Sequence, residues 1–572
     1  LSIIYILVIG TLEQCLSEED NSYKWPTVGI SVLVRNKAHT LPFFLGCLNN
    51  LDYPKDRIYI WITSDYNEDN SIEIIEDWAS QHALDYNTVI INANSSLDHL
   101  TENRITPIQW SESHFKHIIH LREEALSFAR KMWADFLLMI DADAFIVESS
   151  TLKDLVQQDL PVAAPLLISD GLYSNYWLAF DLSCISALCA MTEDLYYKRT
   201  EDYRPILDRE KTGCFEVPMV NTAVLISLKR TKSDLLTYDP KNVQDYKGPK
   251  DDIITFAVNA KMKDIPLFIC NEKLYGFVTI PLQEEDDPMK DFEQLLNVKM
   301  EAISRGTPLP LSWNLKKYVT YPEPSKYGCN EIYMINLERR TERRNLMELS
   351  FKELGMEVTT VFAVDGKKLD LDNLHHQGIR LMPNYEDPYH KRPMKAGEIG
   401  CFLSHYKIWK DIVEKKHDVA LILEDDIKFV PYFRQKFKLL LTEMKEINWE
   451  LMYLGRKILL DSEEEMFGSY VSRPLYSYWT LGYMLTANGA QKLIDSRPLE
   501  NMLPVDEFLP IMFNEHPNDT WKSYYKNRDL QAYSAAPLLI HPTHYTGQPG
   551  YISDTEDSTI IQHHTSSAKV EL

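Results

Sequence analysis

Two short apolar runs that lead straight into acidic residues constrain the fold of this chain more than any other feature. The first run covers 136–140 and leads into Asp141-Ala142-Asp143, and the second covers 420–423 and leads into Glu424-Asp425-Asp426. A short apolar run of this kind is consistent with a buried strand of a parallel sheet. Open α/β sheets bind their ligands beyond the carboxyl ends of such strands. Each acidic cluster is therefore expected at a ligand-binding edge.

Strands alternate with helices around both runs, which predicts a mostly parallel sheet with helices on both faces. The expected strands cover 28–34, 58–63 and 136–140 in the first half, and 331–336, 358–364, 420–423 and 451–454 in the second. Helical spacing of apolar residues predicts helices at 41–49, from 71 onward and at 122–133, and then at 339–354, 396–413 and 488–494. The two halves share this pattern without an obvious sequence repeat.

The 572 residues suffice for two large domains. The pattern weakens between them, where an acidic run and four prolines surround one expected helix at 292–303. We therefore divide the chain into a leader at 1–22, a first domain at 23–280, a linker at 281–326, a second domain at 327–550 and a tail at 551–572.

The net charge is −24, from 60 basic and 84 acidic residues. A nucleic-acid-binding protein needs a basic face, so the charge argues against that class. It permits bound metal ions and a basic protein substrate. The eight cysteines form no zinc-binding spacing. Four of them, Cys184, Cys189, Cys214 and Cys270, either pair with one another in the first half or remain buried thiols.

The two ends of the chain suggest its compartment. Residues 1–10 form an apolar stretch too short to span a bilayer, and they resemble the core of a secretory signal peptide; a buried first strand is the alternative. No later segment qualifies as a membrane span, and Asn94 and Asn518 head glycosylation sequons. The last four residues, 569–572, read Lys-Val-Glu-Leu and resemble the Lys-Asp-Glu-Leu retention signal. Together these features indicate the lumen of the endoplasmic reticulum.

The acidic clusters suit a divalent cation. Mg²⁺ and Mn²⁺ prefer oxygen ligands and keep positions open for phosphates, so Asp141 and Asp143, or Asp425 and Asp426, are candidate metal ligands. A cation bridging a diphosphate would neutralise charge on a departing nucleotide. The alternative for either cluster is a strand-end turn with solvated acids.

The second half strongly resembles glycosyltransferase family 25. The resemblance rests on ordered motifs that run from about 327 to 542, namely Ile335-Asn-Leu-Glu-Arg-Arg340, Arg343-Arg344, Val364-Asp-Gly366, Gly397-Glu-Ile-Gly-Cys-Phe-Leu-Ser-His405, Trp409, Leu421-Ile-Leu-Glu-Asp-Asp-Ile427, Gly482-Tyr483, Gly489-Ala490 and Pro504-Val-Asp-Glu507. The first half resembles the N-terminal domain of the animal members that act on procollagen. Its matching pieces are Val34-Arg-Asn-Lys-Ala-His39, Asp52-Tyr-Pro-Lys55, Asp65, Asp69-Asn-Ser71 and Asp141-Ala-Asp143.

This resemblance implies two tandem GT-A-like domains of the α/β class, the Rossmann-like fold that binds nucleotide sugars. It implies transfer of galactose from UDP-galactose to hydroxylysine residues of procollagen, with Mn²⁺ or Mg²⁺ as cofactor. The reaction is expected to invert the sugar, from an α-linked donor to a β-linked product. A homodimer is compatible with this type of enzyme.

The resemblance also implies roles for single residues. Asp141 and Asp143 would hold the metal and the UDP diphosphate in the first domain, and Glu424, Asp425 and Asp426 occupy the equivalent place in the second. The remaining candidates for binding the donor are Asp65 near the nucleoside, Arg35, Arg122, Arg339, Arg340 and Arg343 at phosphates, and His405 at the sugar. For the arginines a structural ion pair or a solvated helix face is the alternative, and for His405 it is a hydrogen-bonded core position.

Inverting transfer needs a general base that takes the proton of the acceptor hydroxyl. The candidates are Asp506 and Glu507 in the second domain, and Asp251 and Asp252 in the first. His541 and His544 are weaker candidates for a metal shell.

Three questions stay open at the level of sequence. Both domains could catalyse, or one could have become a support or acceptor-binding module. The chain could instead be a catalytically inactive relative of the adhesion type. It could also be a galactosyltransferase for another acceptor, such as a glycolipid.

Overall fold

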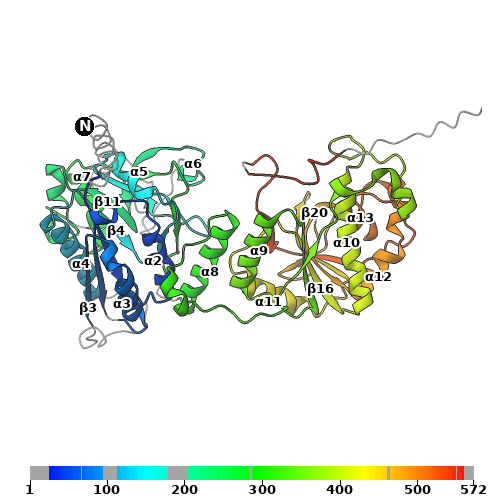
Figure 1. Ribbon diagram of the computed structural model, residues 1–572, viewed down its shortest axis with the longest axis horizontal. Coiled ribbons are helices and arrows are strands. Elements are labelled where there is room, and N and C mark those ends of the chain that lie inside the picture. Colours follow the sequence, from blue (N-terminus) through cyan, green and yellow to red (C-terminus); the bar gives the residue numbers. More distant parts are fainter. Residues whose placement is uncertain are drawn as a thin grey trace, which may run out of the picture. The chain divides into compact units, whose positions relative to one another are not determined.

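The computed structural model describes residues 25–65, 67–94, 112–177, 203–246, 248–282, 286–459, 464–548 and 550–559. The chain forms two compact units, which are treated separately below (Figure 1). The first comprises residues 1–302 and 307–320, and the second comprises residues 303–306 and 321–572.

The first unit is built on an eight-stranded sheet. Its strands run in the order β3 (Thr88–Asn94), β2 (Ile58–Asp65), β1 (Val28–Val34), β4 (Phe136–Asp141), β11 (Ala223–Ser227), β6 (Val162–Pro165), β12 (Leu267–Cys270) and β9 (Cys214–Val217). The four strands from β3 to β4 are parallel, and β11 is antiparallel to both of its neighbours. Shorter pieces flank this sheet, namely β5 (Ala144–Ile146), β7 (Leu167–Ile168), β8 (Tyr176–Trp177), β10 (Met219–Val220) and β13 (Gly276–Val278).

Helices cover both faces of this sheet (Figure 1). One apolar core joins it to α2 (Leu41–Asn49), α3 (Ser71–His82), α5 (Thr151–Gln157) and α8 (Met289–Ser304). A second core joins the opposite face to α4 (Glu112–Lys131), α6 (Tyr203–Leu207) and α7 (Asp252–Met262). Because β1 and β4 are buried between two helical layers, they consist almost entirely of apolar residues.

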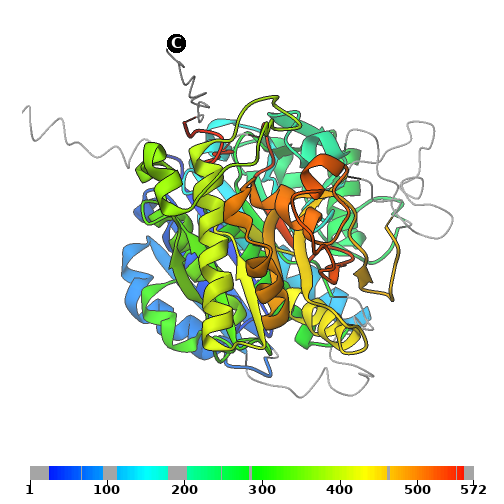
Figure 2. The same ribbon diagram turned by 90° about the vertical axis from the view of Figure 1, so that its right-hand side faces the viewer.

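The second unit repeats this layout on a seven-stranded sheet. Its order is β15 (Thr359–Phe362), β14 (Glu331–Asn336), β16 (Val419–Leu423), β20 (Ser477–Thr486), β18 (Leu451–Ile458), β21 (Ala532–Ala535) and β19 (Val471–Ser472). Beside it, β17 (Ile427–Phe429) pairs with β22 (Ile540–Pro542). One face packs against α10 (Ala396–Lys415), α12 (Ala487–Asp495), α13 (Val505–Met512) and α14 (Asp519–Lys522), and the other carries α9 (Thr341–Leu354) and α11 (Phe433–Met444). Figure 2 shows α10 in yellow-green beside α12 in orange.

The expected α/β class with two tandem domains is confirmed, and every strand predicted from an apolar run is present. The sheets are mixed rather than mostly parallel, because β11 and β20 each run against both neighbours. An apolar run carries no information about strand direction, which explains this difference. The predicted helix at 122–133 proves to be the second half of α4, which begins at Glu112.

Cys214 and Cys270 form a disulfide between β9 and β12, which decides the open alternative between pairing and buried thiols for these two cysteines. Cys184 and Cys189 lie outside the described residues, as do the expected leader at 1–22 and the retention-like residues 569–572. None of the described helices is long and apolar enough to cross a membrane.

Candidate active sites

The first candidate site lies at the carboxyl edge of β4 in the first unit. Leu33 of β1 lies beside Asp141, and Val34 lies beside Ser64 of β2, so the three parallel strands end at one edge. Asp141 and Asp65 are the last residues of their strands. Arg35 follows β1 directly, so the fold brings these three predicted residues to the same edge.

Asp141 contacts a guanidinium. Arg122 of α4 lies 3.3 Å from the Asp141 carboxylate through Nη2, and its Nε donates a hydrogen bond to Asp252. The backbone N–H of Asp141 donates to the carbonyl of Thr222 at 2.8 Å, which fixes the end of the strand. Arg122 is therefore engaged in an ion pair that joins two of the predicted acids.

Asp143 contacts a lysine that it shares with a further carboxylate. Lys37 Nζ lies 2.9 Å from Asp143 and 2.9 Å from Asp291 of α8, and His39 Nε2 lies 3.3 Å from Asp291. Sequence reasoning missed Lys37 and Asp291, although Lys37 belongs to a motif that was noticed. Asp291 lies about 150 positions after Asp141 and Asp143 in the sequence, and no sequence pattern connects it to them.

The charges of the first site do not balance. Four carboxylates, Asp141, Asp143, Asp252 and Asp291, share two permanent cations, Lys37 and Arg122, which leaves a net charge of −2 (−4 + 2). Burial raises the pKa of Asp141 to about 6, and the nearby carboxylates of Asp143 and Asp252 act in the same direction against Arg122. A divalent cation would offset this repulsion, so the donor set fits such an ion.

The two candidate bases of the first unit both have structural contacts. Asp251 precedes α7, and its carboxylate accepts a hydrogen bond from the backbone N–H of Ile254 at 2.7 Å, which caps the helix. Burial and the neighbouring Asp252 raise the pKa of Asp251 to about 6. Asp252 is buried and paired with Arg122.

The second candidate site lies beyond β16, where Glu424, Asp425 and Asp426 follow the strand. Thr480 of β20 donates to Glu424 at 2.5 Å, and Asn336 at the end of β14 donates to Asp425 at 2.7 Å. Neighbouring strands of the sheet thus position the first two acids of the cluster.

Arg343 of α9 is a permanent cation in contact with this cluster. Its Nη1 lies 3.1 Å from Asp425 and 3.2 Å from Asp426, so three carboxylates face one guanidinium with a net charge of −2 (−3 + 1). The second oxygen of Asp426, Oδ1, is buried and has no hydrogen-bond partner among the described residues. Burial and Glu424 raise the pKa of Asp426 to about 7, against the opposing effect of Arg343. An unpartnered carboxylate oxygen in an acidic cluster fits a divalent cation.

These acids line a cavity of about 150 Å³. Its walls also include Arg339 and Arg343, together with Cys401 and His405 from α10. At one side of the cavity the loop at Gly366 packs closely against the first turns of α10. A Cβ on Gly400 would lie only 2.4 Å from the Val364 carbonyl oxygen, so this position has room for glycine alone.

Residues 551–559, which we term the C-terminal strap, form another wall of the cavity. Asp554 of the strap contacts both Arg339 and Arg340, and Arg343 Nη2 donates to the carbonyl of Ile552 at 2.7 Å. Gly397 N donates to Ser558 at 2.8 Å, and a Cβ on Gly397 would lie 2.7 Å from the Cα of Thr555. The sequence division at residue 550 had assigned this segment to the tail, and no apolar pattern marks it.

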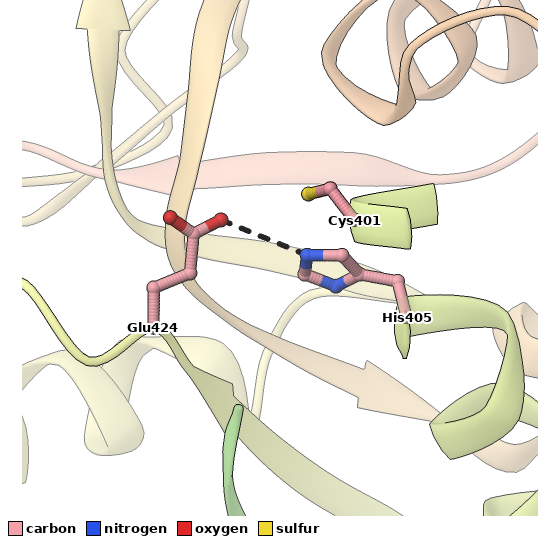
Figure 3. Close-up of side chains that lie close together, drawn as sticks. All are labelled: Cys401, His405 and Glu424. Carbon is pink, nitrogen blue, oxygen red and sulfur yellow. Dashed lines mark ion pairs between the residues drawn. The ribbon is translucent and has the colours of Figure 1, made fainter. Parts of the chain in front are cut away.

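His405 lies at the back of the cavity and is 1% exposed. Its Nδ1 lies 2.9 Å from the hydroxyl of Tyr483, and its Nε2 lies 3.6 Å from Glu424 (Figure 3). Burial alone would raise the pKa of Glu424, but the nearby His405 ring and the hydrogen bond from Thr480 lower it.

The candidate bases of the second unit differ from each other. Glu507 is buried and accepts a hydrogen bond from Tyr476 at 2.7 Å, and His516 Nε2 lies 2.8 Å away. Asp506 has no such contact among the described residues, and burial together with Glu507, Glu398 and Glu424 raises its pKa to about 7. A carboxylate with a pKa near neutrality suits a general base.

The histidine pair of the second unit lies on and after β22. His541 lies opposite Lys428 of β17, and burial together with Lys428 and Lys436 lowers its pKa. His544 lies next to Gly550, the residue before the strap.

Family models match both units. The model described as the N-terminal domain of glycosyltransferase family 25 matches residues 25–299, and the model of glycosyltransferase family 25 (LPS biosynthesis protein) matches residues 329–509. A glycosyltransferase 25 family member from Anopheles gambiae is 48% identical over 96% of this chain and 91% of its own length. Procollagen galactosyltransferase 2 from Homo sapiens is 44% identical over 94% of this chain and 85% of its own length.

A solved structure of a mannosyltransferase from Pyrobaculum calidifontis, in complex with GDP-Man and Mn²⁺, also matches. It is 13% identical with a TM-score of 0.26, over 52% of this chain and 71% of that chain.

The paired α/β units and their matching models define an enzyme that transfers a sugar. The chain belongs to glycosyltransferase family 25, as its motifs predicted, and it is a hexosyltransferase.

Proposed function

We propose that the protein transfers galactose from UDP-galactose to hydroxylysine residues of procollagen chains, with inversion at the sugar and with Mn²⁺ or Mg²⁺ as cofactor. Relatives at 44% and 42% identity, from human and mouse, carry the name procollagen galactosyltransferase 2. The acceptor is then a long chain that carries basic residues. A protein of net charge −24 attracts such a chain electrostatically. The signal-like start and the retention-like end support a lumenal enzyme of the endoplasmic reticulum.

We assign the transfer to the second unit, and one observation carries this choice. The buried Oδ1 of Asp426 has no hydrogen-bond partner in the part of the chain that the structure describes, and it belongs to a net-negative cluster that lines a cavity together with Arg339 and Arg343. Among the described residues of the first unit, neither Asp141 nor Asp143 has a buried carboxylate oxygen without a hydrogen-bond partner. The first unit is then a support or an acceptor-binding module.

The residues of the second unit divide the chemistry among them. Glu424, Asp425 and Asp426 are the oxygen donors that would hold the divalent cation, which supplies charge neutralisation at the diphosphate when bound. Arg339 and Arg343 present guanidinium groups suited to phosphate oxygens. Asp506 takes the proton of the hydroxylysine hydroxyl. At the same time the hydroxyl oxygen bonds to C1 of galactose, and the bond between C1 and the UDP oxygen breaks. A single displacement of this kind inverts the anomeric carbon.

Galactose transfer to a hydroxylysine-bearing collagen peptide tests the proposal. Wild type should transfer galactose from UDP-galactose with Mn²⁺ and lose activity with a chelator. Asp425→Asn/Asp426→Asn should abolish transfer, whereas Asp141→Asn/Asp143→Asn should retain it, provided that both variants show the far-UV circular dichroism of wild type.

The remaining outcomes separate the alternatives. Loss of activity in the first-unit variant alone would assign transfer to the first unit, and loss in both would mean that both sites are needed. A folded wild type that fails on the collagen peptide but hydrolyses UDP-galactose, or transfers its galactose to a different acceptor, would indicate another acceptor. A folded wild type without any use of UDP-galactose would indicate the inactive adhesion type.

A further inference from the structure

Cys401, His405 and Glu424 bring a sulfur, a nitrogen and an oxygen donor together at the back of the cavity in the second unit (Figure 3). We propose that these three side chains form a binding site for Zn²⁺ or a similar thiophilic divalent cation, distinct in its donor chemistry from the all-carboxylate cluster at Glu424, Asp425 and Asp426. Neither the sequence patterns nor the proposed function gives Cys401 a role.

The fold presents these donors from two rigid elements. Cys401 and His405 are four residues apart on α10, so they lie on one face of the helix. Glu424 directly follows the buried strand β16, where Thr480 holds its carboxylate. Figure 3 shows the cysteine and histidine side chains directed toward the carboxylate.

The spacing of the donors suits a shared metal ion better than a hydrogen bond. His405 Nε2 lies 3.6 Å from Glu424 Oε1, which is too long for a hydrogen bond. Ligands about 2.0–2.3 Å from a tetrahedral Zn²⁺ lie roughly 3.3–3.8 Å from one another. All three donor atoms lie within 4.8 Å of one another, so a contraction of roughly 1 Å completes the set.

The surroundings of His405 provide an independent sign. The side chain is 1% exposed, yet its Nε2 has no hydrogen-bond partner among the described residues. Tyr483 accepts a hydrogen bond from Trp409 at 2.9 Å, and its hydroxyl lies 2.9 Å from His405 Nδ1. When Nδ1 carries the proton and donates to Tyr483, the lone pair of Nε2 points at the other two donors. Metal-binding histidines are held in this way by an oxygen on the opposite ring nitrogen.

The donor set also predicts which cation binds. Thiolate and imidazole select zinc over hard cations, whereas carboxylates alone suit Mg²⁺ and Mn²⁺. Three protein ligands leave a fourth position open toward the cavity, which is the arrangement of an accessible rather than a closed structural site. Since Glu424 belongs to both donor sets, a zinc ion bound here withdraws one carboxylate from the neighbouring cluster.

Co²⁺ serves as a spectroscopic probe for this site. Metal-free full-length protein titrated with Co²⁺ should develop a thiolate-to-cobalt charge-transfer band at one equivalent, and Zn²⁺ should displace it. Cys401→Ser should abolish the band, and His405→Gln should weaken Co²⁺ binding by more than about tenfold. Cys329→Ser, at a buried free cysteine of the same unit, should leave the band unchanged.

A further variant separates this site from the hard-cation cluster. Asp425→Asn leaves all three proposed ligands in place, so it should retain the cobalt band even if it impairs binding of Mn²⁺. The absence of a thiolate band in folded wild type would overturn the proposal, and so would a band that persists in Cys401→Ser. Because the readout is the metal spectrum, the result does not depend on whether galactose transfer is confirmed.

Discussion

Asp554 and Arg340 form a two-point ion pair although 214 positions separate them in sequence. Nε of Arg340 donates to Oδ2 of Asp554 at 2.8 Å, and Nη2 donates to Oδ1 at 2.9 Å. Arg339 donates to the same carboxylate at 2.8 Å. The chain thus places its own anion on two arginines that the family resemblance implies for a diphosphate. The strap is consequently held over the cavity by a charge that a nucleotide would also supply.

Removing this carboxylate should release the strap. Asp554→Ala deletes three charge-assisted hydrogen bonds. Such a bond contributes roughly 1.5–3 kcal/mol only where it is buried. We therefore expect the free energy of opening the strap to fall by about 1–2 kcal/mol in total. Amide hydrogen exchange of residues 551–559 should accelerate by roughly five- to thirtyfold. Asp557→Ala, at an exposed position of the same strap, is the matched control and should leave exchange unchanged. Equal exchange in both variants would show that other contacts hold the strap.

The pair of Arg122 with Asp141 and Asp252 should dominate the stability of the first unit. Arg122→Met leaves the buried Asp252 and the partly exposed Asp141 without their cation, and stranding a buried charge typically costs about 3–5 kcal/mol. Denaturant unfolding should show the loss in the transition of the first unit. Arg122→Met/Asp252→Asn should recover part of it, because one of the two stranded charges is then gone. If Arg122→Met proved as stable as wild type, solvent or a bound cation would already screen these acids.

Gly400 should tolerate no side chain. Its position in α10 places a hypothetical Cβ 2.4 Å from the Val364 carbonyl oxygen and 2.9 Å from the Gly366 nitrogen, and both are backbone atoms. Gly400→Ala gains roughly 1 kcal/mol of helix propensity but must move the helix or the loop, at a cost of about 1–3 kcal/mol or more. Thermal unfolding of the second unit should therefore shift downward. Gly171→Ala, where nothing lies within 4 Å of the new Cβ, should leave the melting temperature unchanged.

Much of the fold was predictable because buried strands are locally encoded. The apolar runs at 136–140 and 420–423 identify β4 and β16, and the acids that follow them identify two ligand-binding edges. The direction of β11 and β20 was not predictable, since an apolar run reads alike in either direction. From the sequence, the motifs that contain Gly366, Gly397 and Gly400 could only be matched to a family. The structure gives the physical reason for these glycines, because the backbone packs closely at all three positions.

The partners of the site residues were harder to predict than the residues themselves. Lys37 with Asp291, and Arg340 with Asp554, are brought together only by the tertiary fold. No periodicity or spacing connects positions more than 200 residues apart. Cys401 belongs to a motif that was identified in the sequence. Only the geometry of α10 and β16 shows that its sulfur lies within 4.8 Å of donor atoms of His405 and Glu424.

Asp506 should set the acid limb of the pH profile if it is the general base. Its pKa is raised to about 7 by burial first and by Glu507 next, and a base acts only when deprotonated. The value of kcat/KM should therefore rise about tenfold per pH unit below roughly pH 7 and level off above it. Asp506→Asn should lower kcat by about 10²–10⁴ and remove this limb.

The same pKa has the opposite consequence for stability. Since the folded protein holds this proton more tightly than the unfolded chain, the free energy of unfolding falls as pH rises from the ordinary value of 3.8 through about 7. Asp506→Asn should therefore raise the melting temperature at alkaline pH and leave it unchanged in acid. Glu507→Gln is the informative comparison, because Glu507 is held by Tyr476 and His516 and its charge helps to raise the pKa of Asp506. This variant should lower stability and shift the acid limb to lower pH without removing it. An acid limb that survives Asp506→Asn would assign the proton to another group, with the Glu424–Asp426 cluster the next to test.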